Sequence, residues 1–239
     1  MCIADVHLGS PESQFRTLID VIAKADENTY FILLGDILDN AIKDSIGDIY
    51  NQDMNPHEAF EQAIGLFEQA KGQILGVIEG NHEARTRKQV GVDILGLLCE
   101  ERHIPYSNDI LVLDIAVGTR APRDMKRRVQ YTLVCGHGYS ASRTVGGKIT
   151  ANGRLIDVVV NGDIYLTAHT HQPSILKLAR FEADTRNKKI QRRDFYLITV
   201  PSWTGYENYA AVKFMHPSAE AFVELELSGL EKHIEVKMR

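Results

Sequence analysis

The first half of the chain alternates between continuous apolar runs and segments with helical spacing. The apolar runs at 29–39 and 73–80 each contain a glycine followed by a polar residue near their ends, as buried central strands often do. In residues 55–71 the apolar positions recur on one helical face. Asn55 is a suitable N-cap for this helix, and Pro56 suits its first position. Strands that alternate with helices predict α/β layering.

Strand-like segments dominate the second half, and one helical segment, 153–161, interrupts them. Residues 183–189 predict a hairpin turn, and the Gly-rich stretch 142–153 predicts a flexible loop. No repeat or long linker divides the chain, so we expect a single domain, 1–239. Its expected class is α/β, with two mixed β-sheets packed as a sandwich flanked by helices. The expected strands are 109–116, 129–138, 164–171, 174–183, 190–202, 210–214, 221–227 and 233–238.

Composition excludes some classes of protein without naming a function. The chain of 239 residues is 44% hydrophobic and 25% charged, and its net charge is -5, so we do not expect general electrostatic binding of nucleic acid. The three cysteines are scattered, which fits no disulfide framework or Cys-x-x-Cys metal site and favours a reducing, cytoplasmic location. No apolar run reaches about 18 residues and no signal peptide is recognisable, so no membrane association is expected.

Candidate chemistry gathers where the expected strands end. Five of the nine histidines fall there, each beside a carboxylate, an amide, a glycine or another histidine. In α/β sheets ligands bind outside the carboxyl ends of strands, so strand ends far apart in sequence can form one site. The stretches are Asp5-Val6-His7, Gly35-Asp36 with Asp39, Gly80-Asn81-His82-Glu83, Gly136-His137-Gly138 and Ala168-His169-Thr170-His171.

Each stretch alone also has an ordinary structural interpretation. Asp36 could cap the next helix, and Asn81 could be a turn residue. His169 and His171 point to one side if the backbone stays extended, which favours metal binding, but alone they could equally close a strand. The combination decides between these interpretations, because random placement would not put five histidines at strand ends. We therefore expect a metal site.

Together the stretches resemble the signature of the calcineurin-like metallophosphoesterases. That signature runs D-x-H, G-D-x-x-D, G-N-H-[DE], G-H and G-H-x-H, and this chain has DVH, GDILD, GNHE, GHG and AHTH in the same order. The resemblance covers most of the chain and implies the family fold, an α/β/β/α sandwich. Residues 49–85 further resemble the bacterial and prophage members of the family.

The resemblance implies a role for each matched residue. The catalytic candidates are His82, which would approach the leaving-group oxygen, and Asp39, which with Glu83 would orient ligands. Imidazole and carboxylate ligands suit two divalent or trivalent ions (Mn, Fe, Zn or Ni), and a hydroxide bridging them would attack phosphorus in line. The ligands would be Asp5, His7 and His171 on the first metal, Asn81, His137 and His169 on the second, and Asp36 bridging both.

Three features depart from the family pattern. Ala168 stands where the family has glycine, and we expect an ordinary backbone there, at which alanine costs nothing. The arginines of the protein-phosphatase branch are absent after Leu38 and before Gly80, so a Ser/Thr phosphoprotein substrate is not expected. The strand before Asp5 is very short, which suggests a trimmed N-terminus.

Substrate binding rests on weaker signals. Arg85, Arg143 and Lys148 are the candidate phosphate-binding residues, although a solvated helix face is the more common explanation for a residue such as Arg85. Seven basic residues between Lys177 and Arg193 could guide a polyanion such as single-stranded DNA or RNA, or could protect an edge strand from aggregation.

The expected activity is hydrolysis of a phosphodiester, with nucleic acid or a nucleotide as a candidate substrate. Two alternatives stay open. One is a phosphomonoesterase or pyrophosphatase acting on a small metabolite, and the other is a non-catalytic scaffold that keeps the fold. The sequence does not determine the native metal, the substrate or the oligomeric state.

Overall fold

The structure is a computed structural model that describes residues 1–43, 45, 49–118, 128–206, 208–212, 214 and 216–239. The strands are β1 (Cys2–Ile3), β2 (Phe31–Leu33), β3 (Ile74–Ile78), β4 (Tyr106–Ser107), β5 (Ile110–Val117), β6 (Val129–Gly136), β7 (Ile164–Thr167), β8 (Ser174–Asp184), β9 (Lys189–Thr199), β10 (Val223–Leu227) and β11 (Ile234–Met238). The helices are α1 (Phe15–Ala23), α2 (Pro56–Gln69), α3 (Glu83–Val90), α4 (Ile94–Glu101), α5 (Val145–Gly153), α6 (Leu155–Val158) and α7 (Asn208–Val212).

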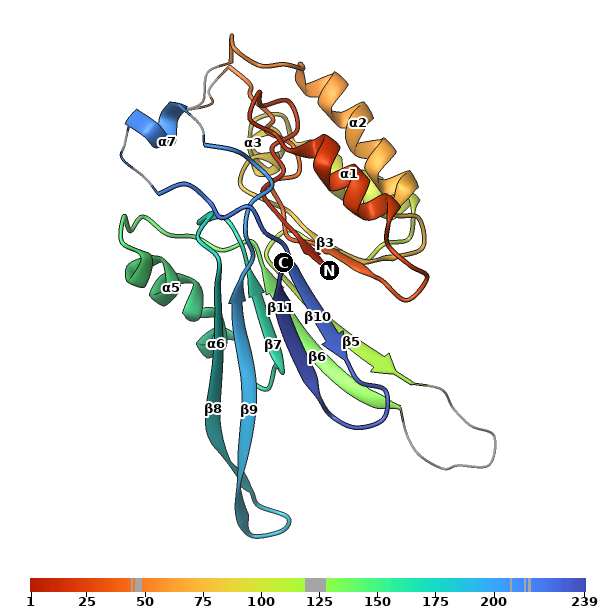
Figure 1. Cartoon of the computed structure of the whole chain (residues 1–239), viewed down its shortest axis with the longest axis vertical. Helices are drawn as coiled ribbons and strands as arrows, with labels where there is room; N and C mark the ends of the chain where they lie inside the picture. The colour runs from red at the N-terminus through yellow and green to blue at the C-terminus, as the bar shows by residue number, and fades with distance from the viewer. Residues whose placement is uncertain (44, 46–48, 119–127, 207, 213, 215) are drawn as a thin grey trace.

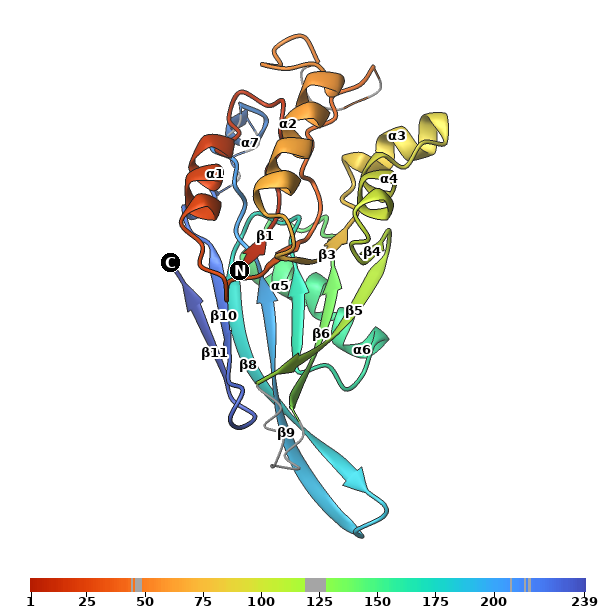
Figure 2. The same ribbon diagram turned by 90° about the vertical axis from the view of Figure 1, so that its right-hand side faces the viewer.

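Two mixed β-sheets pack face to face, with helices on the outer side of each (Figures 1 and 2). The first sheet has the strand order β11-β10-β1-β2-β3-β4, and the second has β5-β6-β7-β9-β8. β1, β2, β3 and β4 are parallel to one another, as are β6, β7 and β9, while the remaining strands pair antiparallel. This arrangement confirms the predicted fold class.

Alternating side chains along the strands fill three apolar layers. In β2, Phe31 packs with the helices α1 and α2, while Ile32 packs between the two sheets. In β7, Ile164 faces the other sheet, whereas Tyr165 packs beside Leu155 of α6. Strands buried on both faces carry continuous apolar sequence, which explains the runs seen in the first half of the chain.

The start of α2 confirms the capping prediction. The Asn55 side chain accepts hydrogen bonds from the backbone N–H groups of His57 and Glu58, at 2.9 and 3.1 Å. The Glu58 carboxylate in turn accepts the Asn55 N–H at 2.9 Å, and Pro56 stands at the first helical position.

Two expectations about local structure were wrong. Residues 208–212 form the helix α7, where a strand was expected at 210–214, and alanines at two of its positions favour the helix. Residues 145–153 form the helix α5 instead of a flexible loop. Thr144 caps α5 by accepting the N–H of Gly147 at 3.2 Å, and tertiary contacts of buried side chains override the weak helix propensity of its glycines.

The topology places the ends of several strands at one edge of the sandwich. β1, β2 and β3 of the first sheet and β6 and β7 of the second all end there, whereas the β8–β9 hairpin extends away from this edge (Figure 2).

In the described residues no helix is both long and apolar enough to cross a membrane. All three cysteines are buried and free.

Candidate metal centre

The five sequence stretches meet at this edge, where hydrogen bonds join the loops that carry them. The backbone N–H of Asp5 donates to the carbonyl of Gly35 at 3.0 Å, and the N–H of His7 donates to the carbonyl of Asp36 at 3.0 Å. The N–H of His169 donates to the Asp5 carboxylate at 3.1 Å, which ties the last stretch to the first.

Two glycines allow the loops after β2 and β3 to approach each other. A Cβ on Gly80 would lie 2.1 Å from the backbone nitrogen of Asp36. A Cβ on Gly35, which has a φ of 88°, would lie 2.5 Å from the nitrogen of Gly80. Any larger residue at either position would therefore push Asp36 away from Asn81, which explains the glycine in both stretches.

The first group of potential ligands contains Asp5, His7 and His171, whose ligand atoms lie within 4.8 Å of one another. His7 directs Nδ1 at Asp39 Oδ1, 3.2 Å away, so Nδ1 carries the proton and the lone pair is on Nε2. Among the described atoms, this buried Nε2 and Asp5 Oδ1 have no hydrogen-bond partner. Unpaired buried acceptors are costly, and a cation between them would satisfy both, so this donor set fits a metal ion.

The second group contains Asp36, His137 and His169, again within 4.8 Å. His137 donates from Nδ1 to the carbonyl of Leu34 at 2.7 Å, which leaves Nε2 as the nitrogen that can bind a metal. This Nε2 lies 3.2 Å from Asp36 Oδ2 and 3.1 Å from Asn81 Oδ1. Nε2 of His137 thus lies beside a carboxylate oxygen of Asp36 and the amide oxygen of Asn81, and these donors could hold a second ion together with His169.

The charges in the site favour cations. Burial alone would lower the pKa of His137, but the carboxylate of Asp36 raises it to about 10. Burial also opposes protonation of His82, yet Asp36 and Asp39 raise its pKa to about 9. Both shifts arise from the negative charge of Asp36, which a bound metal ion would neutralise.

Asp39 and Glu83 form hydrogen bonds that orient the side chains and loops of the site. Asp39 Oδ1 lies 3.2 Å from His7 Nδ1 and 3.0 Å from His82 Nδ1, so one carboxylate orients both rings. These three side chains also lie close enough to hold a metal, but the two Nδ1 atoms already face Asp39 as donors. Glu83 accepts the backbone N–H groups of Asp36, Leu38 and Gly80, at 3.1, 2.8 and 3.0 Å.

Many of the potential ligands have a strained backbone. Positive φ angles of 50–65° occur at five of the seven, namely Asp5, His7, Asp36, His169 and His171. Left-handed conformations cost about 1–3 kcal/mol each at residues other than glycine, and they concentrate at functional sites. The sequence offered no sign of this strain beyond the residue types, since Asp and His tolerate the region better than β-branched residues do.

The expectation of an extended backbone at His169 and His171 was wrong. The N–H of Thr170 donates to the carbonyl of Ala168 at 2.7 Å, which closes a γ-turn about His169. The turn sends the two rings in different directions. His171 faces Asp5, with 3.6 Å between Nε2 and Oδ1, while the centroid of the His169 ring lies 5.2 Å from that of His137.

Ala168 keeps an ordinary backbone, as predicted. It is not among the described residues with positive φ, and its methyl group is fully buried between the sheets. Alanine is therefore compatible with the position that is glycine in the family signature.

Replacing Ala168 by glycine should destabilise the protein by about 1–2 kcal/mol, through added freedom of the unfolded chain and loss of a buried methyl group. Metal affinity should not change, because the γ-turn does not depend on the methyl group. Denaturant unfolding of both proteins measures the first effect, and metal titration measures the second. A more stable glycine variant would show that the alanine is strained.

The three candidate substrate-binding residues have different surroundings. Arg85 lies beside the site, where Nη1 donates to the carbonyl of Asp39 at 3.2 Å and to Ser45 Oγ at 3.3 Å. Arg143 is exposed in the loop before α5. Lys148 is only 7% exposed and donates to the carbonyl of Thr170 at 3.0 Å, a placement that favours a structural role.

The basic residues of the β8–β9 hairpin give little support to a polyanion track. The hairpin tip is remote from the strand ends that form the site (Figures 1 and 2). Arg193 pairs with Asp163 at 2.9 Å, and Lys177 and Arg192 both pair with Asp194, at 3.9 and 2.9 Å.

Two buried amides that contact the site were missed in the sequence. Asn40 donates to the carbonyl of His82 at 2.7 Å and to Thr86 Oγ1 at 2.7 Å, so it fixes the start of α3. Asn152 on α5 contacts the loops around His137 and His169. Asn40 directly follows the second stretch, which is a weak signal. Asn152 lies in the Gly-rich stretch 142–153 but outside the five stretches that carry the candidate ligands, so the sequence does not connect it with the site.

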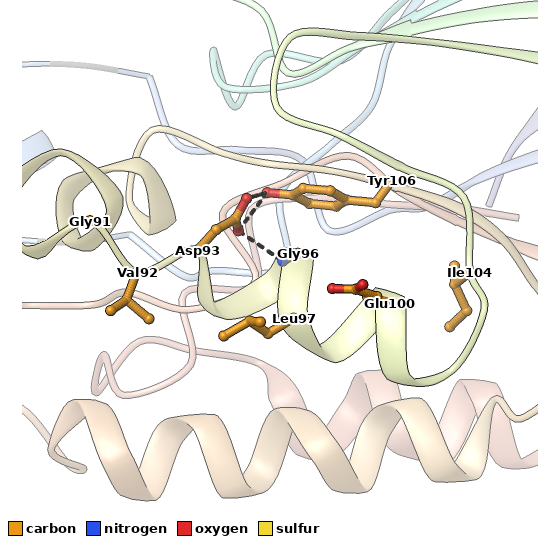
Figure 3. A pocket seen from close by; sticks show the side chains of 8 residues that line it. All are labelled: Gly91, Val92, Asp93, Gly96, Leu97, Glu100, Ile104 and Tyr106. Carbon is orange, nitrogen blue, oxygen red and sulfur yellow. Dashed lines mark hydrogen bonds between the residues drawn. The ribbon is translucent and has the colours of Figure 1, made fainter.

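A separate pocket of about 630 Å³ lies beside α4 and contains none of the predicted site residues. Figure 3 shows that Asp93, on its wall, already accepts hydrogen bonds from Tyr106 and Gly96. The pocket therefore does not compete with the strand-end site as a metal centre.

Comparison with known proteins agrees with the signature. The family model of the calcineurin-like phosphoesterases matches residues 1–173. The search of curated proteins gave no match.

Among solved structures, the chain is similar to a Vps29 double mutant from Entamoeba histolytica, with 12% identity, coverage of 99% of this chain and 96% of that chain, and a TM-score of 0.48. It is similar to a metallophosphoesterase from Sphaerobacter thermophilus, with 14% identity, 87% and 77% coverage and a TM-score of 0.40. It is also similar to Vps29 from Chaetomium thermophilum, with 11% identity, 100% and 95% coverage and a TM-score of 0.41.

Proposed function

We propose that this chain, which belongs to the calcineurin-like phosphoesterase family, hydrolyses a phosphodiester with the help of two bound metal ions. The observation that carries the proposal is the pair of ligand groups at one sheet edge, together with two buried acceptors of the first group, Asp5 Oδ1 and His7 Nε2, that have no hydrogen-bond partner. The donor set of imidazole and carboxylate suits Mn, Fe, Zn or Ni. Bound ions supply an activated water at neutral pH and take up charge on the phosphoryl oxygens.

The proposed ligands fall into two sets, one for each metal ion. Asp5, His7 and His171 would hold one ion, and Asn81, His137 and His169 would hold the other. Asp36 would bridge them, and its Oδ1 is fixed by the N–H of His82 at 2.8 Å. Asp39 and the Leu34 carbonyl set which nitrogens of His7 and His137 are free to bind.

His82 would act on the leaving group. Its Nδ1 donates to the carbonyl of Asp39 at 2.7 Å, so the ring orientation is fixed. Its Nε2 lies 3.9 Å from Asp36 Oδ2 and therefore faces the reaction centre. A protonated His82 can hand the Nε2 proton to the departing alkoxide oxygen, with Asp39 holding the ring.

A diester is favoured over a monoester because of the charges near the site. A monoester carries about one more negative charge than a diester at neutral pH, and a further cationic group directed at the phosphate would favour it. Arg85 already donates to Asp39 and Ser45, while Lys148 donates to Thr170. The hydrogen bonds of these two side chains are thus directed at the protein and not at a second phosphate charge, which suits a singly charged diester.

The substrate class can be tested with two chromogenic esters. The Mn²⁺-loaded protein should hydrolyse bis-(p-nitrophenyl) phosphate with at least about tenfold higher kcat/KM than p-nitrophenyl phosphate. Oligonucleotides and nucleotides form further arms of the same assay. A preference for the monoester would overturn the diester proposal and favour a phosphomonoesterase or pyrophosphatase.

A non-catalytic scaffold is the remaining alternative. It is disfavoured because the chain keeps every ligand residue of the signature together with His82. A purified protein that holds no metal, and in which Mn²⁺ restores no hydrolysis of any ester tested, would favour the scaffold.

A further inference from the structure

Helix α5 lies against the turn that carries two of the proposed ligands. Lys148 and Asn152 are one helical turn apart on α5, and both side chains are buried, with 7% and 3% exposure. Lys148 Nζ donates to the carbonyl of Thr170 at 3.0 Å, and Asn152 Nδ2 donates to the carbonyl of Ala168 at 3.4 Å. These two carbonyls belong to the peptide groups that directly precede His171 and His169.

Asn152 also reaches the loop of a third ligand. Its Oδ1 accepts the backbone N–H of Tyr139 at 3.3 Å, two residues after His137. A Cβ on Gly138 would lie 2.8 Å from this Oδ1 and 3.1 Å from the carbonyl of Ala168, so the two loops and the amide are closely packed. One side chain therefore connects the strand ends that present His137 and His169.

The burial of Lys148 calls for a compensating interaction. Lysine is almost never buried without a partner, because an ammonium group loses its hydration. In the described part of the chain no carboxylate forms an ion pair with Lys148, and burial lowers its pKa. Its hydrogen bond is directed at the last residue of the γ-turn, between His169 and His171, whose φ angles are 65° and 52°. Such a turn persists only where its surroundings determine it.

We infer that Lys148 and Asn152 are positioning residues that hold the peptide groups before His171 and His169, and thereby fix one ligand of each proposed metal. The effect on metal binding rests on the proposed two-metal function. The two hydrogen bonds from α5, which we call the clamp, are present without metal. Lys148, expected from the sequence to bind substrate, acts in this account through the histidines.

The test uses Lys148→Met, which keeps the length of the side chain and removes its donor. Lys71→Met is the matched control, since it removes one charge from an exposed site next to α2. In the metal-free protein, backbone hydrogen exchange of residues 167–172 should be faster in Lys148→Met than in the control. Affinity for Co²⁺ should fall about 10–100-fold, as for other groups that orient metal ligands, and the visible Co²⁺ absorption bands should shift.

Asn152→Leu gives a second route if Lys148→Met fails to fold, as judged by circular dichroism. It should speed exchange in the same segment and weaken Co²⁺ binding to the His137 and His169 group. Wild-type exchange and wild-type Co²⁺ affinity in a folded variant would overturn the clamp. If the wild-type protein bound no Co²⁺, the two-metal function would fail, while the exchange comparison would still decide whether the clamp holds the turn.

Discussion

Replacing His82 by alanine is expected to reduce phosphodiester hydrolysis by about 10²–10⁴-fold while leaving both metal ions bound. The ring has one nitrogen fixed by the carbonyl of Asp39 at 2.7 Å and the other directed at the reaction centre. His82 is not in the ligand groups around Asp5 and Asp36, so its loss removes the proton donor without removing a ligand.

The His82 experiment compares steady-state kinetics with metal content. His57→Ala is the matched control, because His57 lies exposed on α2 and pairs only loosely with Glu61, at 3.6 Å. A diester with a better leaving group should lose less activity, since its oxygen needs less protonation. An alanine variant with wild-type activity would refute the assigned role, and one that loses metal would show that His82 is a ligand.

Replacing Asp36 by asparagine is expected to weaken binding of both metals, on the order of 10²-fold or more, and to abolish hydrolysis. The carboxylate is buried, and Oδ2 lies 3.2 Å from His137 Nε2. A neutral amide cannot offset the repulsion between two cations about 3.5–4 Å apart. The fold should survive, because the backbone N–H of Asp36 still donates to Glu83.

Calorimetric titration of the metal-free variant with Mn²⁺ measures the loss of affinity, and thermal unfolding checks the fold. Asp114→Asn, at an exposed position on β5, is the control for removal of one negative charge. Loss of a single metal, with the other bound at wild-type affinity, would mean that Asp36 is a terminal ligand of one ion and not a bridge.

Much of the candidate site could be predicted because the ends of buried strands can be recognised in the amino-acid sequence. Glycine followed by a ligand residue after an apolar run marks the carboxyl end of a buried strand, and those ends meet at one edge. The close approach of Gly35 and Gly80 explains why the second and third stretches keep glycine, while Ala168 needs none. Side chains alternate in direction along each strand, which likewise explains why successive residues of one strand lie in different apolar layers on the two faces of a sheet.

The parts that sequence reasoning missed depend on tertiary contacts. Five ligand candidates have positive φ, which hydrophobic pattern does not encode. The helix α5 has three glycines and a weak apolar pattern, and its contacts through Lys148 and Asn152 make it a helix and not a loop. The burial of Lys148 is likewise not visible in a Gly-rich stretch, where the sequence alone predicts a substrate-binding residue.

The number of metal ions per chain tests the central claim most directly. The wild-type protein is stripped of metal, equilibrated with Mn²⁺, separated from free ions and measured by elemental analysis. The account predicts two ions per chain, one for the group of Asp5, His7 and His171 and one for the group of Asp36, His137 and His169. A ratio of one ion or none would contradict it.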